Sequence, residues 1–440
     1  MLKEHSFKSL KNSPAKIRPE NNSSSIEDHP YLTRLSKILF VLCIFFVLYG
    51  TSIPFQARAG GGVEDMVESN VTNQIVFTGL FFLSLLTIIP KAKTIYSFLK
   101  EEKIFSIFIL WCAATILWSD ESSVSFKRFF QFITIILVII SAIAYTDDAD
   151  ELIDIFKYLL VPYVIISLIT IAIIPRAIDQ WGSFKGIAPS KNNFGQYILI
   201  SILFFSHLFF KGGSREKLFY LILLVFSTLL IFGSRSATAV ITFVVVFMLN
   251  IILFINKEFE AIGFRKFFFA IVMIFFVALA SLAIVYSSEI INSFFGGMGK
   301  DLTLTGRTDI WASVLENARS HIVQGCGYQS FWISVNPFIE EFYETYYWIP
   351  LQSHSGYIDI LNELGIIGLG LFVFWTVKFF KTALSLTDVS LLIWIFITAL
   401  ILNITESTII RARNPTGVMM IFSYLVLQKK YFVAKYTFSR

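Results

Sequence analysis

The chain has 440 residues, of which 55% are hydrophobic and only 15% are charged. Together with a mean hydropathy of +0.70, this composition excludes a set of soluble domains and indicates an integral membrane protein. The formal charge of +5 is ordinary for a protein with basic cytoplasmic loops, so no nucleic-acid partner is indicated. The 48 Phe are spread through long apolar runs, a pattern that favours a helical bundle in the lipid bilayer over a β-barrel.

Familiar catalytic and metal-binding motifs are absent from the sequence, which has no P-loop, no GxSxG elbow and no HExxH. Its three cysteines, Cys43, Cys112 and Cys326, form no CxxC pair and have no metal-ligand spacing. Asp148 and Asp150 have the DxD spacing of metal-dependent sugar-nucleotide transferases, but they lie in a six-residue loop without a soluble domain around it. We therefore expect neither a metal nor a cofactor.

In chain order, residues 1–35 are polar and rich in Pro, Asn and Ser, which predicts a disordered cytoplasmic tail. Twelve apolar stretches follow, each predicting a transmembrane helix: 37–54, 73–90, 103–118, 128–146, 152–175, 193–210, 218–232, 236–255, 266–287, 356–377, 389–406 and 416–428. The expected architecture is all-α, with helices 1–9 in residues 36–287 and helices 10–12 in residues 355–428. A large outer loop over 288–354 and a cytoplasmic tail over 429–440 complete it.

The distribution of cations predicts the orientation, because Lys and Arg are retained on the cytoplasmic side during insertion. With both termini inside, the inner segments hold 23 Lys and Arg and the outer segments hold 12. We therefore expect both termini in the cytoplasm and the long loop on the outer face of the membrane.

The loop over 288–354 is too long to be a simple turn, so we expect it to be folded and to lie on the membrane surface. Thr305 and Gly306 supply a turn before Ile310, from which apolar residues recur at helical spacing. The aromatic residues that follow suit either a headgroup interface or a sugar-binding groove. These residues are Phe342, Tyr343, Tyr346, Tyr347 and Trp348.

Several cations on the predicted outer face are candidate anion ligands. Arg235 lies in a tight junction between two apolar spans, where it meets either a lipid phosphate or a buried anion. Arg307 precedes a helix start, so its guanidinium and free amides suit a phosphate, unless it is simply an exposed surface residue. Lys191 opens the sixth span before Asn192 and Asn193, where a plain helix start is the alternative.

His354 is the His predicted at the outer membrane boundary, immediately before the tenth span. A neutral imidazole there suits proton transfer from a sugar hydroxyl, and Gly356 beside it leaves room for a sugar. Packing at a helix end is the alternative. Arg411 and Arg413, near the eleventh span, are interpreted as residues that snorkel to the headgroups.

At this point the sequence resembles the superfamily of O-antigen ligases and Wzy-type polymerases. His354-Ser355, then Gly365 after nine residues and Gly368 after two more, looks like the family's signature. Supporting pieces occur in the family's order at 191–195, 234–236, 305–311 and 325–328, and the set covers roughly 185–370. The pieces at 51–55 and 118–120 also look like the exopolysaccharide-polymerase (ExoQ-like) branch.

The resemblance implies a metal-independent glycosyltransferase at the periplasmic face of the bacterial inner membrane, acting on glycan carried by undecaprenyl pyrophosphate. It also implies that the loop over 288–354 is periplasmic. In that family's pattern, Arg235, Arg307 and Lys191 would bind the donor pyrophosphate, and His354 would orient or deprotonate the acceptor hydroxyl. Candidate acceptor or glycan contacts are Asn192, Asn193, Tyr328, Tyr346 and Trp348.

The function that we expect is polymerisation of lipid-linked repeat units into exopolysaccharide or O-antigen. A chain-length regulator of the export machinery is an expected partner. A ligase that moves finished O-antigen to lipid A core, or glycan to a protein, remains open because the motifs do not separate the two. A flippase or secondary transporter also suits twelve spans, although transporters typically have two related halves, which are not evident here.

Overall fold

The computed structural model describes residues 30–50, 71–257, 307–333, 336, 338–340, 344 and 352–437. Within these residues the regular structure is helical, apart from one isolated antiparallel bridge between Ile178 and Phe184. The predicted all-α class is confirmed. The expected span at 266–287 lies outside the described residues, as do 288–306 and most of 341–351.

The helices follow the apolar stretches closely. They are α1 (Pro30–Tyr49), α2 (Val71–Ile88), α3 (Ala92–Glu101), α4 (Lys103–Ala114), α5 (Ser122–Ala144), α6 (Asp150–Ile173), α7 (Lys191–Lys211), α8 (Ser214–Gly233), α9 (Ala237–Lys257), α12 (Arg307–Ala318), α14 (Gly356–Ala383), α15 (Ser390–Leu402) and α16 (Pro415–Thr437). Seven of the described helices are long and apolar enough to cross a membrane: α1, α2 with its continuation through α3, α5, α6, α7, α8 and α14. The chain is therefore a multi-pass membrane protein.

The structure moves three predicted boundaries. Helix α1 begins at Pro30 and so includes residues 30–35, which were expected to be tail; proline is well tolerated in the first turn of a helix. Helix α16 continues to Thr437, through residues 429–437 of the expected second tail. The loop expected at 91–103 is largely helix α3. Hydropathy marks where the apolar stretch ends, whereas backbone hydrogen bonds carry a helix beyond it.

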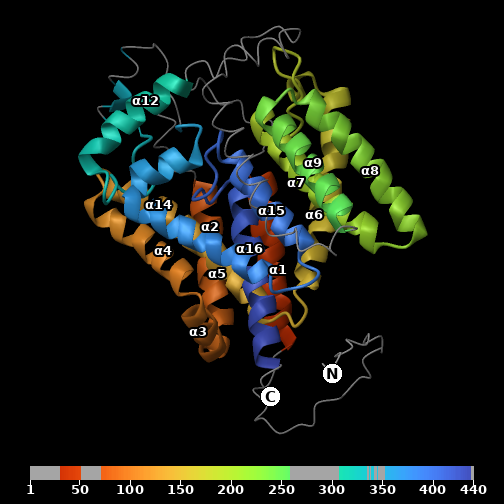
Figure 1. The fold of residues 1–440 in the computed structure, drawn as a ribbon, viewed down its shortest axis with the longest axis horizontal. Helices are drawn as coiled ribbons and strands as arrows, with labels where there is room; N and C mark the ends of the chain where they lie inside the picture. The colour runs from red at the N-terminus through yellow and green to blue at the C-terminus, as the bar shows by residue number, and fades with distance from the viewer. Residues whose placement is uncertain are drawn as a thin grey trace, which may run out of the picture.

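Figure 1 shows α6 to α9 on one side of the molecule and α3, α4 and α14 on the other, with α1 and α16 between them. Every residue from 415 to 428 in α16 is buried, so this helix forms the centre of the packed bundle. Helix α8 is the opposite case. Its Leu218, Leu229 and Phe232 are at least half exposed and form a surface suited to lipid.

The ends of the bundle differ in the segments that they gather. At one end, which we call the terminal end, the start of α1 meets α6 through the Lys37–Glu151 ion pair (2.5 Å). The last turns of α16 meet the same place through Lys430 and Asp150 (2.7 Å). Asp150 also pairs with Lys211, which accounts for the DxD acid as an ion-pair partner. The opposite end, which we call the loop end, contains α12 and the start of α14 (Figure 1).

Gly365 interrupts α14 with φ +69°, a conformation that favours glycine. The segment 322–327 lies against this break, where the amide of Cys326 donates to the carbonyl of Asn362 (2.9 Å). A Cβ atom on Gly365 would lie 2.2 Å from the carbonyl oxygen of Val323, so no larger residue fits without movement. The freed backbone groups are paired within the protein, as non-helical backbone at membrane depth requires. This pairing joins the end of the α12 region to the middle of α14.

Candidate functional site

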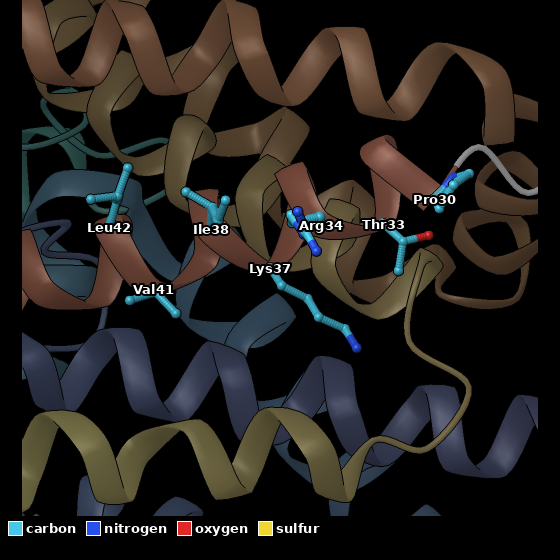
Figure 2. A pocket seen from close by; sticks show the side chains of 7 residues that line it. All are labelled: Pro30, Thr33, Arg34, Lys37, Ile38, Val41 and Leu42. Carbon is cyan, nitrogen blue, oxygen red and sulfur yellow. The ribbon is translucent and has the colours of Figure 1, made fainter.

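A surface hollow along α1 is shown in Figure 2. Its lining comes from that helix alone: Pro30, Thr33, Arg34, Lys37, Ile38, Val41 and Leu42. The Lys37 ammonium is already paired with Glu151. The hollow lies at the terminal end and contains none of the motif residues, so the candidate site must be built at the loop end.

Arg307 is the first residue of α12, and its side chain is only 19% exposed. Its Nη1 donates to the carbonyl of Thr405 (2.7 Å), and its Nη2 lies 3.7 Å from Oε1 of Glu406. Asn192 donates from Nδ2 to the same carboxylate oxygen (3.2 Å). Three segments distant in sequence therefore meet here. We call Asn192, Arg307, Thr405 and Glu406, with His354, the Arg307 cluster.

The start of α7 supplies Asn192. Ser190 is the N-cap of the helix, and its hydroxyl accepts from the backbone amide of Asn193 (3.2 Å). The predicted helix start is therefore confirmed. Lys191 is the first residue of α7, so its ammonium group and the side-chain amide of Asn192 belong to the same helical turn.

His354 lies in the turn before α14 and has φ +56°, a left-handed conformation uncommon for a non-glycine residue. The Ser353 hydroxyl donates to the carbonyl of Ser355 (2.8 Å) across this turn. The amide of Gly356 donates to the Glu406 carbonyl (2.9 Å), which joins the turn to the Arg307 cluster. Burial, and after it the nearby Arg307 cation, lower the pKa of His354 to about 4. The imidazole is therefore neutral near pH 7.

The expected space beside Gly356 is filled. A Cβ atom on this residue would lie 2.2 Å from Oδ1 of Asn403, so the missing side chain leaves room for Asn403. The idea that Gly356 admits a sugar is wrong for this reason.

Arg235 lies in the turn between α8 and α9, has φ +48° and is exposed. Its Nη1 donates to the carbonyl of Trp181 (2.7 Å) in the loop before α7. Three residues further on, Thr238 is hydrogen-bonded to the hydroxyl of Thr405 (3.0 Å). The turn that carries Arg235 thus borders the Arg307 cluster. The Arg235 guanidinium donates to the Trp181 carbonyl, whereas that of Arg307 donates to the Thr405 carbonyl.

Tyr328 is completely buried, and its hydroxyl donates to the carbonyl of Ile410 (2.6 Å). The prediction that it contacts glycan is therefore wrong: it packs between segments of the protein. The other two aromatic candidates, Tyr346 and Trp348, lie outside the described residues.

The buried acids at the loop end were not predicted from the sequence. Glu406 is 3% exposed, and burial raises its pKa to about 7 against the lowering effect of Arg307. Asp359 and Glu363 are buried on one face of α14, one turn apart, and both accept from Nη2 of Arg411 (2.9 and 3.4 Å). The snorkelling interpretation of Arg411 is wrong, because its guanidinium turns inward to these acids. The sequence did offer a signal for this site, because Asp359 and Glu363 lie inside the expected span 356–377, where acidic residues usually have a functional role.

Small hydroxyls near the candidate residues have no partner among the described residues. Ser236 follows Arg235, Ser407 follows Glu406, and both hydroxyls are buried. Buried hydroxyls are usually hydrogen-bonded, so these two are spare donors for a ligand or water. Within the same described residues, no three His, Cys, Asp or Glu side chains come together as metal ligands.

Comparison with known proteins supports the motif analysis. Residues 222–373 match the family model Wzy_C, described as O-Antigen ligase. The chain is 27% identical over 273 residues to the "Exopolysaccharide production protein ExoQ" of Rhizobium meliloti (strain 1021). That match covers 60% of this chain and 60% of the relative's length. The resemblance drawn from the motifs is confirmed: residues 222–373 are similar to the O-antigen ligase family, and the wider chain is similar to an exopolysaccharide production protein of the ExoQ type.

Proposed function

We propose that the protein polymerises undecaprenyl-pyrophosphate-linked repeat units into exopolysaccharide, by metal-independent glycosyl transfer at the periplasmic face of the inner membrane. The observation that carries this proposal is the Arg307 cluster, in which a partly buried arginine and a neutral histidine border the same segment. The similarity to an exopolysaccharide production protein favours this polymer over others. A chain-length regulator is the proposed partner.

Donor binding is assigned to Arg307, Arg235 and Lys191. A diphosphate carries more charge than one arginine neutralises, and planar guanidinium groups bind its oxygens as bidentate forks. Arg235 and His354 are two of four non-glycine residues with positive φ in the described part of the chain. Strained residues of this kind cluster at functional sites. The spare hydroxyls of Ser236 and Ser407 add donors beside the arginines.

His354 is the proposed general base. It would take the proton of the acceptor hydroxyl as that oxygen attacks the anomeric carbon, and the lipid diphosphate would leave, held by the arginines. A single displacement of this kind inverts the anomeric configuration. The Gln352 amide nitrogen lies 3.2 Å from Nδ1 of His354. With the amide turned by half a rotation its oxygen would accept from Nδ1–H, which leaves Nε2 free as the base.

The periplasmic location of the loop end is part of the proposal and rests on the cation bias of 23 to 12. Labelling with an impermeant thiol reagent in intact spheroplasts tests it. Cys326 is first replaced with Ser, because it is less buried than Cys43 and Cys112. Glu316→Cys on α12 should then be labelled, and Lys435→Cys should react only after lysis; the reverse result contradicts the orientation.

Two other functions remain as outcomes of one experiment. The purified protein in liposomes receives a lipid-linked repeat unit alone, or with lipid A core as acceptor. A polymerase extends the glycan from donor alone, giving a ladder of products, whereas a ligase transfers glycan only when lipid A core is present. A flippase moves the lipid without forming a glycosidic bond. A ladder from donor alone is the result that we expect.

A further inference from the structure

We propose that Asp359 is a positioning residue for His354, and that Arg411 holds Asp359 in place. This inference deepens the proposed function and rests on His354 being the base. Asp359 does not touch the reacting atoms. Its carboxylate acts through the turn that carries the imidazole.

The carboxylate of Asp359 is fully engaged. Its Oδ1 accepts from the backbone amide of Ser353 (3.3 Å) and from Nε1 of Trp332 (3.0 Å). Its Oδ2 accepts from Nη2 of Arg411 (2.9 Å). Asp359 is 1% exposed, so each of these bonds forms away from water.

The bond to Ser353 fixes the residue directly before His354. Trp311 on α12 donates from Nε1 to the carbonyl of Ser353 (2.8 Å), so both backbone groups of Ser353 are held from different elements. A left-handed backbone at a non-glycine residue such as His354 is strained and persists only where its surroundings determine it. The carboxylate of Asp359 supplies one of these restraints.

Arg411 and the start of α14 both stabilise the negative charge of the buried Asp359 carboxylate. Asp359 lies in the first turn of α14, where the helix dipole favours a negative charge. The Arg411 guanidinium neutralises it and also reaches Glu363, one turn further along the helix. Glu363 is as buried as Asp359, but its Oε2 accepts from the amide of Gln329 (3.1 Å), away from the His354 turn.

The two acids therefore form a matched pair for mutation. Both are buried, both lie on α14 and both bind Arg411, but only Asp359 restrains Ser353. A purely structural role for this ion-pair network predicts the same consequence for either change. A positioning role predicts that only the Asp359 change alters the placement and the protonation of the His354 imidazole.

The charged groups around His354 give a second readout. The Arg307 cation faces it from α12, with Glu406 of the loop 403–414 behind that cation. The Asp359 anion faces it from α14 and raises the pKa of His354, in opposition to burial and Arg307. Loss of the anion should therefore make the imidazole harder to protonate.

The experiment compares Asp359→Asn, Glu363→Gln and wild type, purified in liposomes with a lipid-linked repeat unit. We expect Asp359→Asn to lower kcat by roughly 10- to 100-fold with donor KM within about two-fold, because misplacement of a base by an ångström costs about that much. The acid limb of its kcat profile should move to lower pH. Glu363→Gln should leave that limb in place. Equal losses from the two variants, with unmoved limbs, would assign the network to structure alone and overturn the proposal.

Further variants keep the inference distinct from the proposed function. Where Asp359→Asn fails to accumulate, Trp332→Phe removes one donor from the same carboxylate and should lower kcat about three-fold at unchanged KM; a wild-type kcat there contradicts the inference. His354→Ala is run beside them. If it keeps full activity, the base assignment has failed. If it is inactive while Asp359→Asn has wild-type activity, only the positioning role has failed.

Discussion

The ion pairs at the two ends of the bundle differ in their exposure to water. At the terminal end, the side chains of Lys37 and Glu151 are 36% and 52% exposed. At the loop end, those of Arg307 and Glu406 are 19% and 4% exposed. Exposed pairs contribute little to stability, whereas buried pairs carry a desolvation cost that packing alone does not require. We therefore attribute the buried charges of the Arg307 cluster to the chemistry of the loop end.

Glu102 is an exception at the terminal end. It is buried, pairs with Lys378 (2.8 Å) and accepts from the hydroxyl of Tyr424. These contacts join the start of α4 to α14 and to the central helix α16. Its partners belong to two other helices of the bundle, and we interpret Glu102 as a structural contact.

Among the charged residues of the two ends, the largest expected effect comes from Arg307. Arg307→Lys should lower transfer by about 100-fold and raise donor KM, since an ammonium is a point charge that does not reproduce the planar fork. Transfer rates at varied donor concentration measure both. Arg319→Lys is the control on the same segment, because Arg319 is 76% exposed and its ion-pair partner within the described residues is the exposed Glu316. Comparable losses from the two variants would remove the distinction between buried and exposed cations.

The pH dependence of transfer should reveal the environment of His354. The His354 pKa in the free enzyme is lowered to about 4, so on the acid side kcat/KM should fall as the pH drops through that region and the imidazole becomes protonated. A bound diphosphate adds negative charge beside Arg307 and raises this pKa. The acid limb of kcat should therefore lie at higher pH than that of kcat/KM. Coincident limbs near 6.5 would mean that His354 is neither buried nor close to the donor.

Glu406 should make donor binding sensitive to pH near neutrality. With its pKa raised to about 7, Glu406 loses its proton as pH rises and then competes with the donor for Arg307. Donor KM should increase about five-fold from pH 6 to 8, equal to about 1 kcal/mol. Glu406→Gln should give a KM that stays flat over this range. A KM that still rises in the Gln variant would assign the dependence to another group.

The smallest effects are expected at the terminal end. Lys37→Ala and Lys435→Ala each remove one exposed ion pair, with Glu151 and Glu101 respectively. Transfer should change by less than about two-fold and the free energy of unfolding by under about 1 kcal/mol. Thermal unfolding in detergent and the same transfer assay measure the two quantities. A large loss of transfer from either variant would show that activity is not confined to the loop end.

Much of the fold follows from apolar stretch length, because a helix that crosses a membrane must satisfy its own backbone bonds. Local patterns also predicted the starts of α7 and α12. The pairings at the loop end were beyond such patterns: Asp359 and Arg411 lie 52 positions apart. Tyr328 was misjudged for a related reason, since tertiary packing decides whether an aromatic ring is exposed. The break at Gly365 depends on the distant segment 322–327, which no local window contains.

If the loop end carries out glycosyl transfer through His354, removal of the imidazole should stop transfer without preventing donor binding. Wild type and His354→Ala, purified at equal amounts, are given the same lipid-linked donor, and donor binding and transfer are measured in one sample. We predict unchanged donor binding with transfer reduced by roughly 10²- to 10⁴-fold, the usual contribution of a general base. Wild-type transfer by a normally abundant His354→Ala protein would contradict the account.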